Sequence, residues 1–172
     1  IQYVQKEFLE PDVWENLNIG AYAVSDGYLT NEEIYGYIYN FYASDDERGI
    51  CPLGFHIPSN EDWLILIDYL GGESIAGGKL KEIGTEYWNI PNIGASNEYG
   101  FSARPAGLRY DHNGNFNYLR YRAYFGSSNN NYSVQINYDS EIIISNYYES
   151  NNSNSIENLG FSIRCLESIE GC

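Results

Sequence analysis

Apolar positions change from helical to strand-like spacing along this chain. The clearest helical stretch follows Pro58, where the apolar positions are Trp63, Leu64, Leu66, Ile67 and Leu70. This wide apolar stripe, preceded by Ser59 as an N-cap and by acidic residues in the first turn, predicts a helix. Gly71 and Gly72 are expected to end it, and a shorter helix is predicted over 75–83.

From Trp88 onward, short apolar runs alternate with turn residues and predict strands. The expected strands lie within 100–110, with a break at Pro105, and at 123–128, 133–138, 141–145 and 160–165. Asp111 to Asn115 reads DHNGN between two strand-like runs, which predicts a hairpin turn. Helices early and antiparallel strands late indicate an α+β fold.

The first 44 residues are less regular. Residues 1–10 alternate in part and predict an edge strand, and 13–19 form a short apolar element with Trp14 and Leu17 in the core. Over 30–44 two patterns compete: Thr30 with Glu33 fits a helix capping box, whereas tyrosines at every second position favour a strand. We favour a strand after Gly36.

Charge excludes some partners. The net charge is −15 with only 9 Lys and Arg residues, which argues against binding to nucleic acid or to an anionic membrane surface. No run of about 20 apolar residues predicts a membrane span. The chain begins at Ile1 without an initiator Met or a leader, so we expect a secreted protein whose signal peptide has been removed.

Short motifs suggest chemistry but give weak support for it. Asp111, Asn113 and Asn115 resemble a calcium loop, but no glutamate follows at EF-hand spacing, so a hairpin turn is favoured and calcium is only a weak expectation. The two histidines, His56 and His112, complete no evident Ser/His/Asp set. We therefore predict a protein that is not an enzyme and has no cofactor.

Ordered motifs over residues 12–166 resemble the Fibrobacter succinogenes major paralogous domain (FISUMP). The matching stretches are WENL at 14–17, YGYIY at 35–39, CPLGFHIPS at 51–59, DW at 62–63, LGG at 70–72, KLK at 79–81, NEYGFS at 97–102, PAG at 105–107, GNF at 114–116 and GFSIRC at 160–165. Two positions depart from the family pattern, since Phe55 and Gly126 stand where family members carry Trp.

This family is similar to the C-type-lectin-like and formylglycine-generating-enzyme-like fold. The resemblance implies two helices packed on twisted, mainly antiparallel sheets with long irregular loops, in an exported protein. It also implies a disulfide between Cys51 and Cys165. The copper chemistry of the enzyme branch needs two nearby cysteines, and only Cys165 lies in the comparable region.

We predict an N-terminal extension at 1–11, one domain at 12–166 and a tail at 167–172. Tyrosine and asparagine gather late in the chain and suit recognition surfaces. The candidate ligand or assembly residues are Tyr118, Tyr121, Asn129, Asn130, Asn131, Tyr132, Tyr147 and Tyr148. The alternative is that these asparagines lie in ordinary polar loops and that these tyrosines belong to the core.

Two functions are consistent with these residues and with the family resemblance. The first is a secreted, non-enzymatic, lectin-like surface domain for recognition or adhesion, with a glycan or a surface protein as partner. The alternative is a self-assembling subunit of an extracellular filament, tube or sheath. In that alternative, residues 1–11 pair with a sheet edge of a neighbouring copy. Cys172 has no expected partner within the chain and is a candidate intermolecular thiol.

Overall fold

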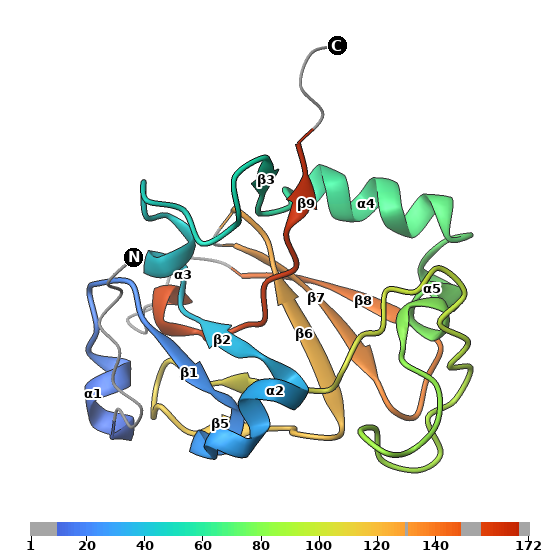
Figure 1. Ribbon diagram of the computed structural model, residues 1–172, viewed down its shortest axis with the longest axis horizontal. Coiled ribbons are helices and arrows are strands. Elements are labelled where there is room, and N and C mark those ends of the chain that lie inside the picture. The colour runs from blue at the N-terminus through green and yellow to red at the C-terminus, as the bar shows by residue number, and fades with distance from the viewer. Residues whose placement is uncertain (1–9, 130, 149–155, 169–172) are drawn as a thin grey trace.

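A computed structural model describes residues 10–129, 131–148 and 156–168, which form a mixed α+β fold of helices and several small antiparallel sheets (Figure 1). The helices are α1 Pro11–Glu15, α2 Glu32–Tyr35, α3 Phe41–Ser44, α4 Asn60–Tyr69 and α5 Glu73–Leu80, with 3₁₀ turns at Ser25–Gly27, Leu29–Asn31 and Ile156–Asn158. The strands are β1 Tyr22–Val24, β2 Tyr37–Tyr39, β3 Phe55–His56, β4 Leu108–Arg109, β5 Phe116–Asn117, β6 Arg122–Gly126, β7 Tyr132–Asn137, β8 Ile143–Tyr147 and β9 Leu166–Glu167.

The main core lies between the antiparallel sheet β6-β7-β8 and the two longer helices. Trp63 and Ile67 of α4 and Leu80 of α5 pack against Val134 and Ile136 of β7. Each of these five side chains is at most 4% exposed. Alternation along β7 places its apolar residues on the face that the helices cover, so burial of that face holds helices and sheet together.

The predicted helix after Pro58 is confirmed as α4. Ser59 forms a capping box: its hydroxyl accepts a hydrogen bond from the Asp62 N–H at 3.2 Å, and the Asp62 carboxylate accepts one from the Ser59 N–H at 2.8 Å. The second predicted helix is confirmed as α5, but it ends at Leu80 because the chain turns to pair with Ala103. The glycine at 77 lets α5 lie against the main chain of residues 141–142, where a Cβ would meet the Ile142 oxygen at 2.6 Å.

The ambiguous segment over 30–44 contains both structures. The strand predicted after Gly36 is confirmed as β2, whereas the capping box predicted at Thr30 is wrong, since α2 begins at Glu32 and has no side-chain cap. The strand stops at the buried Asn40. Its main-chain N–H still donates to the Ala21 carbonyl at 3.1 Å, but its side-chain oxygen replaces its main-chain carbonyl as the acceptor for the Ala21 N–H. The side-chain oxygen of Asn40 accepts from the Ala21 N–H at 2.8 Å and from the Ala43 N–H at 3.1 Å, which caps α3.

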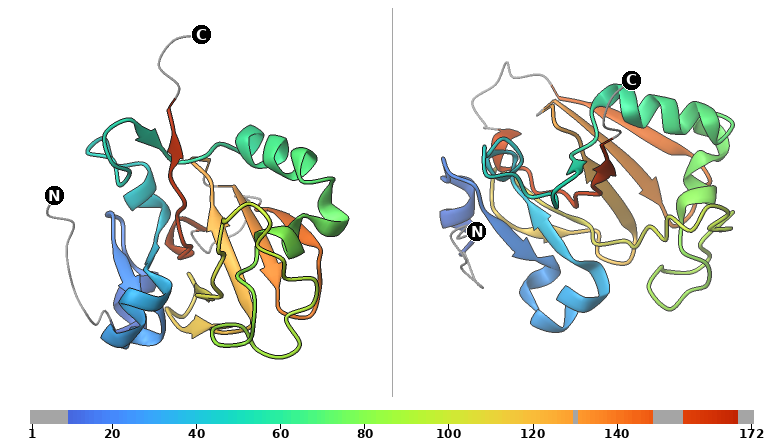
Figure 2. Two further views of the ribbon diagram at one scale, coloured as in Figure 1. Left: turned by 45° about the vertical axis from the view of Figure 1, so that its right-hand side comes forward. Right: turned by 45° about the horizontal axis from the view of Figure 1, so that its top comes forward.

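The late strands are largely as expected. The predicted hairpin is confirmed, since β4 and β5 pair antiparallel on either side of residues 110–115. The segment 160–165, predicted as a strand, instead forms single bridges to three partners: Gly160 with Arg109, Phe161 with Tyr39, and Ser162 with Phe125. It therefore crosses between β2 and β6, as Figure 1 and the left view of Figure 2 show.

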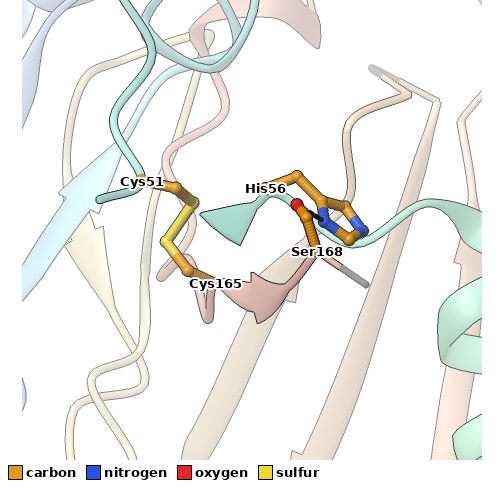
Figure 3. Close-up of a disulfide and its surroundings, with 4 residues drawn as sticks. All are labelled: Cys51, His56, Cys165 and Ser168. Atoms are coloured by element: carbon orange, nitrogen blue, oxygen red, sulfur yellow. Dashed lines mark hydrogen bonds between the residues drawn. A yellow bond between two sulfur atoms is a disulfide. The ribbon is translucent and has the colours of Figure 1, made fainter. Parts of the chain in front are cut away.

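The C-terminal chain is joined to the start of α4. Cys51 and Cys165 form a disulfide, and beside it β3 pairs antiparallel with β9 (Figure 3). The closed loop spans 114 residues, for which the chain-entropy model gives a stabilisation of about 5 kcal/mol. Strand β9 includes Glu167, within the predicted tail. The predicted edge strand in the first nine residues, Asn130 and Cys172 lie outside the described residues.

Candidate ligand-binding groove

A groove of about 470 Å³ lies between β2 and the C-terminal segment. Its lining residues are Ile34, Tyr35, Gly36, Tyr37, Tyr39, Ser102, Arg104, Phe125, Ser162, Ile163 and Arg164. It forms because segment 160–164 follows β2 only as far as the pair Phe161 and Tyr39 and then turns toward the disulfide. This volume lies in the range typical of small-molecule sites.

Tyrosine rings form one wall. Alternation along β2 places Tyr37 and Tyr39 on one face and the fully buried Ile38 on the other. The rings of Tyr37 and Tyr39 lie 6.2 Å apart, and Tyr22 of β1 lies 4.7 Å from Tyr37. The Tyr37 hydroxyl donates to the Glu32 carboxylate, and this hydrogen bond raises the pKa of Tyr37 to about 12. The rings are thus held as a fixed, half-exposed aromatic surface.

The backbone of β2 adds polar groups to this wall. The Tyr39 N–H donates to the Phe161 carbonyl at 2.8 Å, and the Phe161 N–H donates back at 3.0 Å, so the main-chain groups of Tyr39 point away from β1. Because orientation alternates along a strand, the main-chain N–H and C=O of Tyr37 also point away from β1. No described residue hydrogen-bonds to them. They are free to bind a ligand.

Two arginines lie among the lining residues, but their surroundings differ. Arg104 donates to the Glu82 carboxylate and, at 2.9 Å, to the Ile34 carbonyl, and the Glu82 hydrogen bond raises the pKa of Arg104. The Arg164 guanidinium lies 4.5 Å from the centre of the Phe101 ring, and burial lowers its pKa. Arg104 therefore supports the wall, while the donors of Arg164 meet no hydrogen-bond acceptor in the described part of the chain.

Arg164 also borders a second, smaller hollow of about 110 Å³ beside α4. Its other lining residues are Pro58, Asp62, Trp63, Leu66, Phe101, Cys165 and Leu166. Trp63 is 2% exposed, and its indole N–H has no hydrogen-bond acceptor among the described residues. The larger groove and this apolar hollow therefore share one cationic side chain.

The predicted surface residues lie outside the groove. Tyr132 is 1% exposed and belongs to the core, where its hydroxyl contacts that of Ser145 at 3.0 Å, so it offers no contact surface. Tyr118 and Tyr148 are half-buried against the aromatic cluster around Tyr124 and Phe161. The exposed candidates are Tyr121, Asn129, Asn131 and Tyr147.

These exposed candidates divide between two places. Tyr147, at the end of β8, and Asn131, just before β7, are near neighbours, because the Tyr148 N–H donates to the Asn131 carbonyl at 2.8 Å. Tyr121, just before β6, packs instead on Tyr138 beyond the other end of β7. The groove tyrosines 35, 37 and 39 were visible in the sequence as a period-two pattern, but that pattern does not tell which face stays exposed.

A serine, a histidine and an aspartate meet beside the disulfide. His56 Nδ1 lies 2.8 Å from Ser168 Oγ (Figure 3), and His56 Nε2 lies 3.8 Å from the Asp62 carboxylate. The geometry differs from that of a catalytic triad. The same carboxylate oxygen already accepts two hydrogen bonds from Ser59, and the Ser168 N–H donates to the Gly54 carbonyl at 2.7 Å. The cluster ties β9 to the start of α4, and the lack of enzymatic activity stays a prediction.

The described residues contain neither a metal-binding cluster nor a membrane-spanning helix. In residues 10–129, 131–148 and 156–168, no three His, Cys, Asp or Glu side chains are grouped so as to hold a metal ion. At the proposed calcium-like loop, the Asn113 side chain accepts from the Asn115 N–H at 3.0 Å, as expected for a turn. None of the described helices has the length and apolar content needed to cross a membrane.

The order of motifs along the chain agrees with one family model. The model described as the Fibrobacter succinogenes major domain matches residues 2–167, nearly the whole sequence. The chain belongs to this family. The match to the Fibrobacter succinogenes major domain begins ahead of residue 12, where the sequence predicts the domain to start. No curated protein and no solved structure matches the chain.

Proposed function

We propose that this chain is an exported, non-enzymatic recognition domain with a C-type-lectin-like fold, and that it binds a glycan in the groove beside β2. The Cys51–Cys165 disulfide supports export, because such bonds persist in oxidising compartments. Two longer helices, small antiparallel sheets, a long irregular stretch between α5 and β4, and the β3–β9 pair near the C-terminal end support the lectin-like fold.

The observation that carries the proposal is the groove of about 470 Å³ with a tyrosine wall and free main-chain groups. A sugar ring presents C–H groups on its faces and hydroxyls around its rim. The electron-rich faces of Tyr37 and Tyr39 suit the C–H groups, and the main-chain N–H and C=O of Tyr37 suit the hydroxyls. The rings are already fixed by Tyr22 and Glu32, so little side-chain entropy is lost on binding.

The test is a glycan array with the labelled protein, followed by titration calorimetry on the glycans that bind. Tyr37→Ala and Tyr39→Ala should each weaken binding by about 10-fold or more, as expected for an aromatic contact at the centre of a site. Tyr69→Ala is the matched control, because Tyr69 lies on α4 away from the groove and is 69% exposed. Binding that survives Tyr37→Ala unchanged, or an array without signal above background, refutes the proposal.

Self-assembly is the second candidate, and the edge of the main sheet supports it. In the described part of the chain, β8 is paired only with β7, so its outer edge is open. Ile144 and Tyr147 on β8 are 36% and 62% exposed. An open edge with apolar side chains can accept a strand from another copy, for which residues 1–11 are the proposed donor.

This alternative predicts concentration-dependent polymers in negative-stain images and light scattering. Ile144→Lys should abolish them, because a charge on an edge strand opposes pairing. Ile83→Lys places the same charge at a residue that is 63% exposed outside the sheets and should leave assembly unchanged. A monodisperse monomer at high concentration would count against self-assembly.

A further inference from the structure

The partners of the cationic side chains single out one arginine. Of the 9 Lys and Arg residues, Lys6 lies outside the described residues, which leaves eight. Seven of these have an acceptor within the protein: Arg48, Lys79 and Arg104 bind carboxylates, Lys81, Arg109 and Arg120 bind main-chain carbonyls, and Arg122 binds the Tyr124 hydroxyl. Within the described chain, Arg164 alone has neither a hydrogen-bond acceptor nor an ion-pair partner.

The position of Arg164 is constrained although its donors are free. Its guanidinium lies over the Phe101 ring at 4.5 Å, and Phe101 packs in turn against Trp63 and Phe125. The next residue, Cys165, is tied by the disulfide. A planar cation that rests on an aromatic ring, is followed by a disulfide-bonded residue and lines both hollows is prepared to receive a ligand.

The chemistry of the guanidinium selects the ligand group. Arginine offers a rigid fork of donors that matches the two oxygens of a carboxylate, and such paired hydrogen bonds are stronger than those between neutral groups. Ser102 and Ser162 line the same groove, and a serine hydroxyl can donate to or accept from the remaining oxygens of a sugar.

We infer that Arg164 binds the carboxylate of an acidic sugar, a uronic-acid unit, whose ring lies in the groove against the β2 tyrosines. This inference rests on the proposed glycan-binding function and narrows it to acidic glycans. A glycan is favoured over an acidic peptide because the groove combines ring surfaces with a single cation that has no acceptor among the described residues, instead of a row of unpaired strand positions.

The net charge of −15 does not oppose a short acidic ligand. At physiological ionic strength, charges further away than about 8 Å are largely screened. The residues that line the groove include two arginines and no aspartate or glutamate. Next to the wall, Glu82 is paired with Arg104 and Glu32 accepts the Tyr37 hydroxyl, and no described carboxylate forms an ion pair with Arg164. Among the described residues, the charge of Arg164 is therefore not neutralised by an ion pair.

The experiment is calorimetry of the full chain with trigalacturonic acid, its methyl ester and an acidic peptide. The acid should bind about 10- to 100-fold more tightly than the ester, and Arg164→Gln should remove that difference, as expected for the loss of charge-assisted hydrogen bonds. Arg48→Gln removes the same charge from an exposed ion pair with Asp46 and is the matched control. Thermal melting and the intact disulfide mass verify that each variant folds.

The outcomes separate this inference from the proposed function. If neutral glycans bind and the acid has no advantage, or if Arg164→Gln binds the acid as the parent does, glycan recognition stands and the role of Arg164 is refuted. If no glycan binds at all, both fail. If the acidic peptide binds through Arg164 and the sugar acid does not, the anion site stands but its assignment to a glycan is overturned.

Discussion

Replacing Lys81 by methionine should cost this domain a large part of its stability. Lys81 follows α5 directly, and its side chain is fully buried. Its ammonium group donates three hydrogen bonds to main-chain carbonyls, to Ile93 at 2.6 Å, Ser140 at 2.9 Å and Asn137 at 3.0 Å. One cation thereby joins the end of α5, the loop at residue 93 and the turn between β7 and β8.

The magnitude follows from these three contacts. Methionine fills a similar volume but leaves three carbonyls without a donor, at about 1–3 kcal/mol for each buried group that stays unsatisfied. Removing the ammonium also removes its desolvation cost, which offsets several kcal/mol. We therefore expect a net loss of about 3–5 kcal/mol, the range measured when one partner of a buried charged interaction is deleted. The whole free energy of unfolding of a typical domain is only about 5–15 kcal/mol.

The assay is urea unfolding followed by the fluorescence of the three tryptophans, one of which, Trp88, has its ring centre 5.5 Å from the Lys81 nitrogen. In Lys81→Met the urea concentration at the midpoint of unfolding should fall, while the slope of the free energy of unfolding against urea concentration stays unchanged. Lys79→Met is the matched control, because Lys79 is partly exposed and pairs with Glu98 at 3.2 Å, a contact worth less than about 1 kcal/mol. If the two variants unfold within about 1 kcal/mol of each other, the stabilising role assigned to Lys81 is refuted.

Three further predictions use other contacts. Burial lowers the pKa of Lys81 from 10.5 to about 8, so on raising the pH the folded protein loses this proton before the unfolded chain does. The free energy of unfolding of the parent, measured relative to that of Lys81→Met, should therefore rise between about pH 8 and 10. Denaturant titrations at several pH values measure this difference, and free energies of unfolding that change with pH in parallel for the parent and Lys81→Met would refute it. Cys51→Ser combined with Cys165→Ser should lower the free energy of unfolding by about 5 kcal/mol in calorimetric melting, and free thiols at both positions by mass spectrometry in the parent protein produced in an oxidising compartment would contradict the bond. Ser59→Ala should cost about 1 kcal/mol by chemical unfolding, against no change for an exposed control, Ser74→Ala.

Local patterns predicted the elements whose stability is local. Helix α4 was predictable because its cap at Ser59, its apolar stripe and its terminating glycines are contiguous in sequence. The β4–β5 hairpin was predictable because its turn residues lie between the two strands. The end of β2 was not, since it depends on Asn40 contacting Ala21, nineteen residues away.

The candidate site could not be predicted from local sequence patterns either. The sequence indicates tyrosine-rich recognition, but the late tyrosines proposed for it are divided between the core and scattered surface positions, as Tyr132 and Tyr121 illustrate. The groove combines Tyr37, Arg104 and Arg164, which are separated by more than 125 residues from first to last. No local pattern brings such residues together, because their proximity results from strand pairing and packing.

The sequence by itself determined the family, the α+β class and the helix at residues 60–69, because ordered motifs and residue periodicity carry that information directly. Only the tertiary structure decided which tyrosines stay exposed and which cation has no acceptor among the described residues. Both depend on how segment 160–164 leaves β2 after the Phe161–Tyr39 pair and turns to its disulfide. That turn depends on contacts between residues that are far apart in the sequence, and it opens the groove in which Arg164 meets no acceptor among the described residues.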